Sequence, residues 1–116
     1  MSPKPDTWMT CPDTARDHFQ CGLMSSVNSY RFAEAEKHFS RALELLGPEP
    51  GGLLADVLIT YAQLLLQMER PHEAVALFER RLALKRFPNE DRLERRCTAF
   101  HLAELKEELA SGGEAT

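Results

Sequence analysis

The sequence predicts an all-α protein in which antiparallel helix hairpins stack side by side, with five helices in all. Residues 32–45 have a partial copy at residues 71–84. In each copy an Ala, Ala35 or Ala74, is followed after four residues by a Phe and after four more by a Leu. This offset of 39 residues is typical of stacked helical hairpins. Apolar residues recur at three- and four-residue spacing, and no run alternates apolar and polar residues long enough to form a strand.

The first helix is expected at residues 13–27, after a lead at residues 1–12 that should be extended or disordered. Asp13 and Thr14 suit the cap and the first turn of a helix. Asn28 and the serine after it favour a turn. The helix should therefore end just before them.

The second and third helices, at residues 31–46 and 53–69, are separated by the clearest loop of the chain. Gly47 suits a left-handed helix cap, and Pro48 prevents the helix from continuing. The second helix has one apolar stripe, whereas the third is apolar nearly all round. A helix of that kind is contacted from two or more sides, so the third helix should be central.

The fourth and fifth helices are expected at residues 71–86 and 90–110. Pro71 suits the first position of a helix. The Phe-Pro-Asn run at residues 87–89 should separate the two helices, because the residue before a proline disfavours helical geometry. A Ser-Gly-Gly run then follows the fifth helix, and we expect a disordered tail at residues 111–116.

The composition is that of a soluble globular domain. The chain has 116 residues, of which 43% are hydrophobic and 28% charged, and its formal net charge is −4. This length suits one domain, expected at residues 13–110. The net negative charge argues against a dedicated nucleic-acid binder, which would normally have a basic face. The longest apolar run is too short and too polar to span a membrane, and no signal peptide is recognisable, so we expect a cytoplasmic protein.

No set of residues predicts catalysis or a cofactor, so we expect a protein that is not an enzyme and holds no metal. Two pairs, His18 with Cys21 and Cys97 with His101, each share a helix face and could together form a tetrahedral zinc site. We favour ordinary helix packing, because a stack would place the first and fifth helices at opposite ends. No hydroxyl has the context that would activate it as a nucleophile.

The remaining charged and histidine side chains are expected on solvated faces. His38 and His72 fall on the outer faces of their helices. The basic run is formed by Arg80, Arg81, Lys85 and Arg86, with Arg92, Arg95 and Arg96 nearly extending it. This run could meet an acidic partner or RNA, but only Phe87 lies nearby to stack on a base, so a solvated face is favoured.

The pattern resembles the tetratricopeptide repeat, a family in which each repeat pairs two antiparallel helices. The matching positions of the second hairpin are Leu58, Ala62, Leu65, Pro71, Ala74 and Phe78. The resemblance covers about two and a half repeats and implies a right-handed stack. Arg81 occupies a position where the family usually has a small residue, which suggests looser packing at that helix crossing. Lys106 replaces the equivalent of Leu65, which fits a terminal cap with a wet outer face.

The resemblance also implies where a partner binds, because the first helices of successive repeats line a concave groove that takes a helix or an extended peptide. Carried over position by position, the groove residues are Arg16, Phe19, Gln20, Leu23, Ile59, Gln63, Leu66, Phe100 and Glu104. Phe19 and Leu23 occupy two places where a chaperone-binding subclass has residues that grip a terminal carboxylate, so that clamp is absent. The groove should prefer an apolar or amphipathic segment. The same side chains could instead pack on each other or on the N-terminal lead.

Three functions follow from these patterns. The leading hypothesis is a small cytoplasmic adaptor or chaperone-like module that holds a partner polypeptide in the apolar groove. The second is a structural self-assembly unit that homodimerises, through the fifth helix or the groove, to complete a stack that normally needs three repeats. The third, less favoured, is a helical RNA-binding module, whose affinity would fall steeply with salt.

Overall fold

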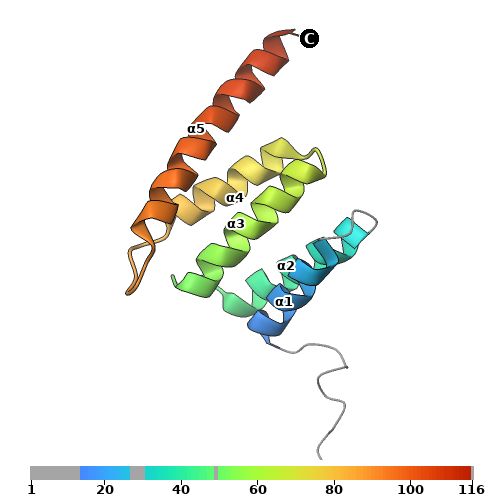
Figure 1. Ribbon diagram of the computed structural model, residues 1–116, viewed down its shortest axis with the longest axis vertical. Coiled ribbons are helices and arrows are strands. Elements are labelled where there is room, and N and C mark those ends of the chain that lie inside the picture. The colour runs from blue at the N-terminus through green and yellow to red at the C-terminus, as the bar shows by residue number, and fades with distance from the viewer. Residues whose placement is uncertain (1–13, 27–30, 49, 116) are drawn as a thin grey trace, which may run out of the picture. The chain divides into compact units, whose positions relative to one another are not determined.

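The computed structural model describes residues 14–26, 31–48 and 50–115, and all five helices lie within them (Figure 1). Their bounds are α1 Ala15–Ser26, α2 Phe32–Leu46, α3 Gly52–Gln67, α4 Pro71–Ala83 and α5 Arg92–Ala115. No strand occurs among the described residues. The prediction of an all-α fold with five helices is confirmed. The expected lead at 1–12 and the turn after the first helix lie outside the described residues.

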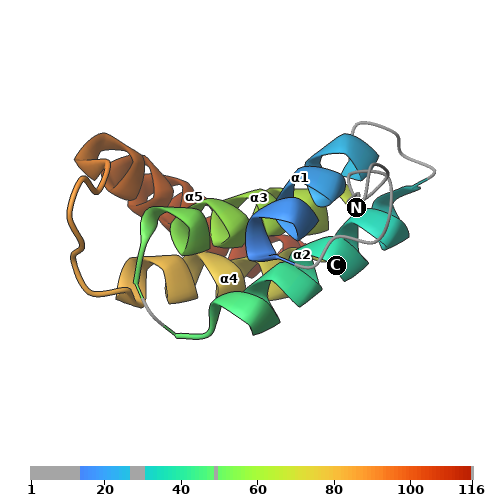
Figure 2. The ribbon, with the colours of Figure 1, turned by 90° about the horizontal axis from the view of Figure 1, so that it is seen from below.

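The helices belong to two compact units, Met1–Gly47 and Pro48–Thr116. In the first unit α1 packs against α2, and in the second unit α4 packs against both α3 and α5. Helices that are consecutive within a unit run in opposite directions, as Figures 1 and 2 show. Each unit is therefore built from antiparallel helix pairs, as the repeat predicted.

In the first unit, a glycine lets α1 approach α2 closely. Ala35, Phe39 and Ala42 of α2 have no exposed surface. A Cβ atom on Gly22 of α1 would lie only 2.5 Å from Cε1 of Phe39, which is closer than real Cβ contacts come. The ring of Phe19 also faces Phe39, with 6.0 Å between the ring centroids. The crossing of the two helices therefore depends on the missing side chain at Gly22.

In the second unit, α3 supplies most of the core. Its side chains that are at most 2% exposed are Leu54, Val57, Leu58, Ala62, Leu64 and Leu65. These positions cover more than one face of the helix, as its apolar pattern predicted. Ala74 and Phe78 of α4 and Leu102 and Leu105 of α5 are also buried. Five of the six repeat positions that carried the resemblance, all except the half-buried Pro71, are therefore buried in this core.

Helix α4 ends at Ala83, three residues before the predicted end at residue 86. The next residue, Leu84, is extended, with φ −63° and ψ 137°. The guanidinium of Arg95 donates hydrogen bonds of 3.0 Å to the carbonyl oxygens of Leu82 and Leu84. Those bonds supply partners for carbonyls that no further helical turn would satisfy, so the early end costs little.

Helix α5 is longer than predicted at its C-terminal end. The carboxylate of Asp91 accepts a hydrogen bond of 3.0 Å from the backbone N–H of Glu94, which caps the first turn. The helix then continues to Ala115, so the predicted end at residue 110 is wrong and residues 111–115 are helical. A glycine inside a helix costs only about 1 kcal/mol relative to alanine, so two glycines do not by themselves stop a helix that has already formed.

Candidate functional site

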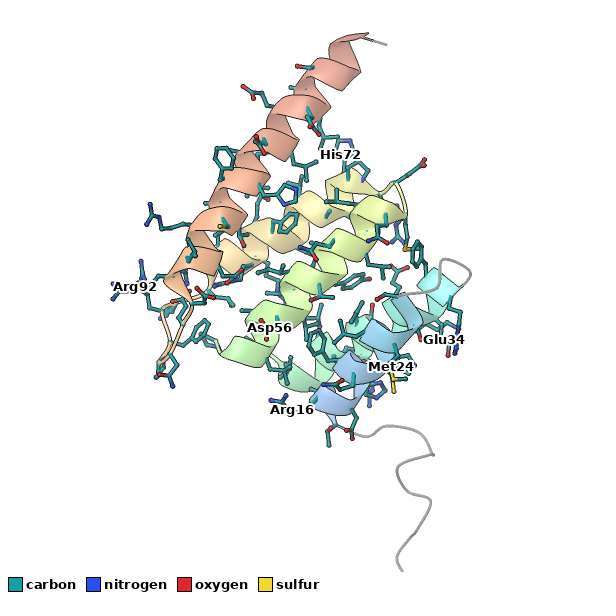
Figure 3. The ribbon with its side chains drawn as sticks, viewed as in Figure 1. Arg16, Met24, Glu34, Asp56, His72 and Arg92 are labelled. Carbon is teal, nitrogen blue, oxygen red and sulfur yellow. The ribbon has the colours of Figure 1, made fainter. Side chains whose placement is uncertain are left out.

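Four of the predicted groove residues lie on α1, in the first unit. Arg16 and Gln20 are exposed, and Arg16 projects away from the helix (Figure 3). Phe19 and Leu23 are half-buried, because Phe19 packs against the ring of Phe39. The spacing of three and four residues places these four on one side of α1. That side offers a partner two polar side chains and the open edges of two apolar ones.

Three further groove residues lie on α3, in the second unit. Gln63 is exposed, whereas Ile59 and Leu66 are half-buried. They are spaced by four and three residues, so they share one face of the helix. The two apolar ones, Ile59 and Leu66, each lie next to a buried core position in sequence, Leu58 or Leu65. The face is therefore a border between core and solvent rather than a sealed interior.

The last two groove residues, Phe100 and Glu104, lie on α5. Phe100 is the most exposed apolar side chain among the nine groove residues. The side chain of Phe100 is 67% exposed, and Glu104 is exposed one turn later. Both line a shallow hollow of about 560 Å³, whose other lining residues are Ala103, Lys106 and Glu107. Leu93 is also 67% exposed, a feature that the sequence analysis did not single out. The apolar surface of α5 therefore extends beyond the two predicted residues.

The nine predicted groove residues thus fall in two units, four in the first and five in the second. Within each unit their spacing places them on shared helix faces. A single groove that joins all nine stays a prediction.

A buried arginine forms the centre of a site that the sequence analysis missed. Arg81 of α4 has no exposed surface. Its Nη2 atom lies 2.6 Å from Oε1 of Glu94 and 3.1 Å from Oε2 of Glu90. Its Nε atom donates to Oε1 of Glu94 at 3.1 Å. The guanidinium also lies 5.8 Å from the centre of the Phe87 ring, at a distance suited to a cation–π contact.

Two more residues complete this cluster, which we call the Arg81 network: Arg81, Glu90, Glu94, Arg95 and Thr98. Arg95 donates a hydrogen bond to Glu90, and the hydroxyl of Thr98 donates to Oε2 of Glu94 at 2.8 Å. The side chain of Glu90 is 4% exposed, that of Arg95 16% and that of Glu94 28%. The Arg81 network therefore ties α4 to the first turns of α5 through charges that are largely shielded from water.

The partners in the network keep its charged groups ionised. Burial alone would lower the pKa of Arg81, but the hydrogen bonds and charges of Glu94 and Glu90 outweigh it and raise that pKa above its ordinary value. The hydrogen bond from Arg95 lowers the pKa of Glu90, against the effect of burial, and Arg81 lowers it further. Nη1 of Arg81 and Oε1 of Glu90 are buried without a hydrogen-bond partner among the described residues. The network thus combines strong charge pairing with incomplete hydrogen bonding.

The position of Arg81 corrects two expectations. We expected looser packing at this crossing, but the long side chain fills it and is fully buried. We also counted Arg81 in the basic surface run, to which it contributes nothing. Glu90 and Glu94 follow Arg81 by nine and thirteen residues and accept its hydrogen bonds. These two acidic residues were the signal in the sequence that could have indicated ion-pair partners for a buried Arg81.

The remaining arginines near the start of α5 form a basic hollow. Arg86, Arg92 and Arg96 are exposed and, together with Arg95, line a space of about 420 Å³. Arg92 projects outward from the start of the helix (Figure 3). Arg95 is committed to the Arg81 network, so three free-standing guanidinium groups face solvent here.

The described histidines and cysteines lie in both units. His38 was expected on an outer face but is half-buried, with its Nδ1 atom 3.1 Å from Nδ1 of His18 in the first unit. His101, in the second unit, packs against Phe78 with 5.1 Å between the ring centroids, and Cys97 is exposed. Among the described residues, no group of three or more His, Cys, Asp or Glu side chains could hold a metal ion.

Comparison with known proteins identifies the middle of the chain. Residues 31–87 match the family described as the tetratricopeptide repeat. This match covers α2, α3 and α4. No curated protein and no solved structure shows a significant match to the chain. Within the described part of the chain, none of the helices has both the length and the apolar character needed to cross a bilayer.

Proposed function

Because residues 31–87 belong to the tetratricopeptide repeat family, we propose that this chain is a small adaptor or chaperone-like protein that binds another polypeptide. The family match is the observation that carries this proposal, since tetratricopeptide repeats are protein–protein interaction modules. The net charge of −4 favours a polypeptide partner over a nucleic acid.

The proposed binding surface is the set of faces on α1, α3 and α5 described above. Each face combines a partly open apolar side chain with an exposed polar one: Leu23 beside Gln20, Leu66 beside Gln63, and Phe100 beside Glu104. An amphipathic helix or extended peptide would pack its apolar side chains on the apolar residues of these faces and would place its polar groups beside the polar residues. Apolar surface removed from water contributes about 25 cal/mol per Å² before ordering costs, so a few such anchors give micromolar binding.

Photocrosslinking from exposed positions tests this proposal without disturbing the core. A photoreactive amino acid at Gln63 should capture a polypeptide from native extract, whereas the same amino acid at Leu45 of α2, which is 41% exposed and outside the groove, should not. The captured protein is then purified, and its affinity for the chain is measured by calorimetry.

Substitutions in the groove should weaken binding of that purified partner. The pair Leu23→Glu with Leu66→Glu should reduce its affinity at least tenfold, and Leu45→Glu should leave it unchanged. Since Leu23 and Leu66 are half-buried, a second pair at exposed positions, Gln20→Arg with Gln63→Arg, provides a test that is less exposed to misfolding. Equal affinity of the wild-type chain and both paired variants would show that the partner does not use this groove.

A second candidate function is self-assembly, and one observation favours it. Leu93 and Phe100 of α5 are both 67% exposed, and apolar side chains that gather on an exposed surface often mark an interaction site. A second copy could provide that cover. Sedimentation at two protein concentrations tests this candidate, because a homodimer dissociates on dilution and a monomer shows no change.

A further inference from the structure

The exposed face of α5 carries two large apolar side chains two helical turns apart. Leu93 and Phe100 are seven residues apart, so they lie on the same face. Thr98, Leu102 and Leu105, which are buried, lie on the opposite face. Arg96, Cys97 and Glu104, which share this face with them, are exposed as well, so the described part of the chain leaves this face of α5 uncovered.

Charge along this face is divided between its two ends. Arg92 and Arg96 are exposed near the start of α5. Glu104, Glu107 and Glu108 are exposed in its second half. None of these five side chains forms an ion pair or a hydrogen bond with another described residue. The face is therefore basic at one end, apolar in the middle and acidic at the other end.

We propose that α5 pairs with α5 of a second copy of this chain, in an antiparallel arrangement centred on Phe100. This inference deepens the self-assembly candidate above and does not depend on the groove. In this register, residues whose numbers add up to 200 lie at the same level of the two helices. Arg96 then lies level with Glu104 of the second copy, and Arg92 lies level with Glu108 of the second copy. Two-fold symmetry produces each of these pairs twice.

The two ends of the face select this arrangement over its alternatives. A parallel pair would place arginines beside arginines and glutamates beside glutamates, which like-charge repulsion disfavours. The antiparallel register centred on Phe100 brings both phenylalanines together in the middle. Leu93 then lies level with Glu107 of the second copy and can pack on the methylene groups of that glutamate.

The overlap covers residues 92–108, which is about 26 Å of helix at about 1.5 Å per residue. Such a short helix pair makes a small interface, so the dimer should dissociate on dilution. Phe100 and Glu104 are also predicted groove residues. The second copy and a groove-bound partner would therefore compete for α5.

A charge exchange tests the register directly. Arg96→Glu places a glutamate level with Glu104 of the second copy, and it should raise the dimer dissociation constant more than tenfold in sedimentation equilibrium. Adding Glu104→Arg to that variant recreates the pair with its charges exchanged and should restore most of the affinity. Arg80→Glu on the exposed surface of α4 makes the same change of charge elsewhere and should have little effect. Equal dissociation constants for the wild-type and Arg96→Glu chains would overturn the proposal.

Disulfide crosslinking tests the direction of the helices, in a variant whose natural cysteines are replaced by serine. In that background Phe100→Cys should form a covalent dimer on mild oxidation, because the two positions meet at the symmetry axis. Leu93→Cys should not, because its two copies would lie about 21 Å apart along the helices. Crosslinking of both variants to the same extent would indicate a parallel pair and would refute the antiparallel register.

These outcomes are independent of the groove proposal. A chain that stays monomeric at all concentrations but captures a partner through Gln63 would refute the dimer proposal and would be consistent with the groove proposal. A chain that dimerises as described but captures nothing through Gln63 would support the dimer proposal and contradict the groove proposal.

Discussion

Glu94→Gln should destabilise the second unit by about 2–3 kcal/mol, because it leaves the buried guanidinium of Arg81 short of charge compensation. The substitution keeps the size and shape of the side chain. Arg81 has no exposed surface, and its shortest contact is the one of 2.6 Å to Glu94. After the change, the nearby negative charge is that of Glu90, which Arg81 shares with Arg95.

The magnitude follows from where the pair lies between two limits. Breaking a fully buried ion pair costs about 3–5 kcal/mol, and an exposed pair is worth about 0–1 kcal/mol. Arg81 is at the first limit, but the side chain of Glu94 is 28% exposed, so water can partly replace the lost charge. A cost of about 2–3 kcal/mol corresponds to a fall in melting temperature of about 8–12 °C for a domain of this size.

Urea unfolding followed by circular dichroism measures this cost. The matched control is Glu79→Gln, which breaks the exposed pair of Glu79 with Lys106, whose side chains are 50% and 53% exposed. That control should cost less than about 1 kcal/mol. If both glutamine variants lowered the free energy of unfolding by the same amount, burial would not be what makes the loss of an ion pair in the Arg81 network costly.

Two further predictions concern other contacts. Gly22→Ala should destabilise the first unit by about 1–3 kcal/mol, because its Cβ would lie 2.5 Å from Phe39, whereas Gly52→Ala, with nothing within 4 Å, should cost nothing by thermal unfolding. Acid should weaken the second unit through Glu90, whose pKa is lowered in the folded state. Its contribution is present above the ordinary glutamate pKa of 4.5 and is lost as pH falls through the lower folded value. Urea midpoints measured from pH 7 to pH 3 should therefore fall more steeply for the wild-type chain than for Glu90→Gln, and parallel slopes would contradict this assignment.

The helices were predictable because their signals are local. Gly47 with Pro48, and Pro71, mark an end and a start that hold in the structure to within a residue or two. The apolar spacing correctly identified α3 as the main source of core residues. The glycines after residue 110 misled the prediction, since glycine weakens a helix without forbidding it.

The Arg81 network was not predictable in the same way, because it depends on residues of another helix. Considered alone, an arginine such as Arg81 at a position that usually holds a small residue predicts poor packing. Its buried charge is compensated by Glu90, from the loop before α5, and by Glu94, from the first turn of α5. His38 was missed for the same reason, since its neighbour His18 lies on a different helix. The single groove needs the placement of the two units relative to each other, which no local pattern encodes.

The way α5 is attached explains why this helix is the one open to a second copy. It buries only two leucines, Leu102 and Leu105, whereas α3 buries a broad apolar surface. The Arg81 network therefore contributes a larger share of what holds α5 than it would for a helix with a full apolar stripe. Charged side chains occupy the inner face at the start of α5, and Leu93 and Phe100 lie on its outer face. Helix α5 is held to α4 by two buried leucines together with ion pairs, and it can thus present its large apolar side chains to another chain without giving up its place in the fold.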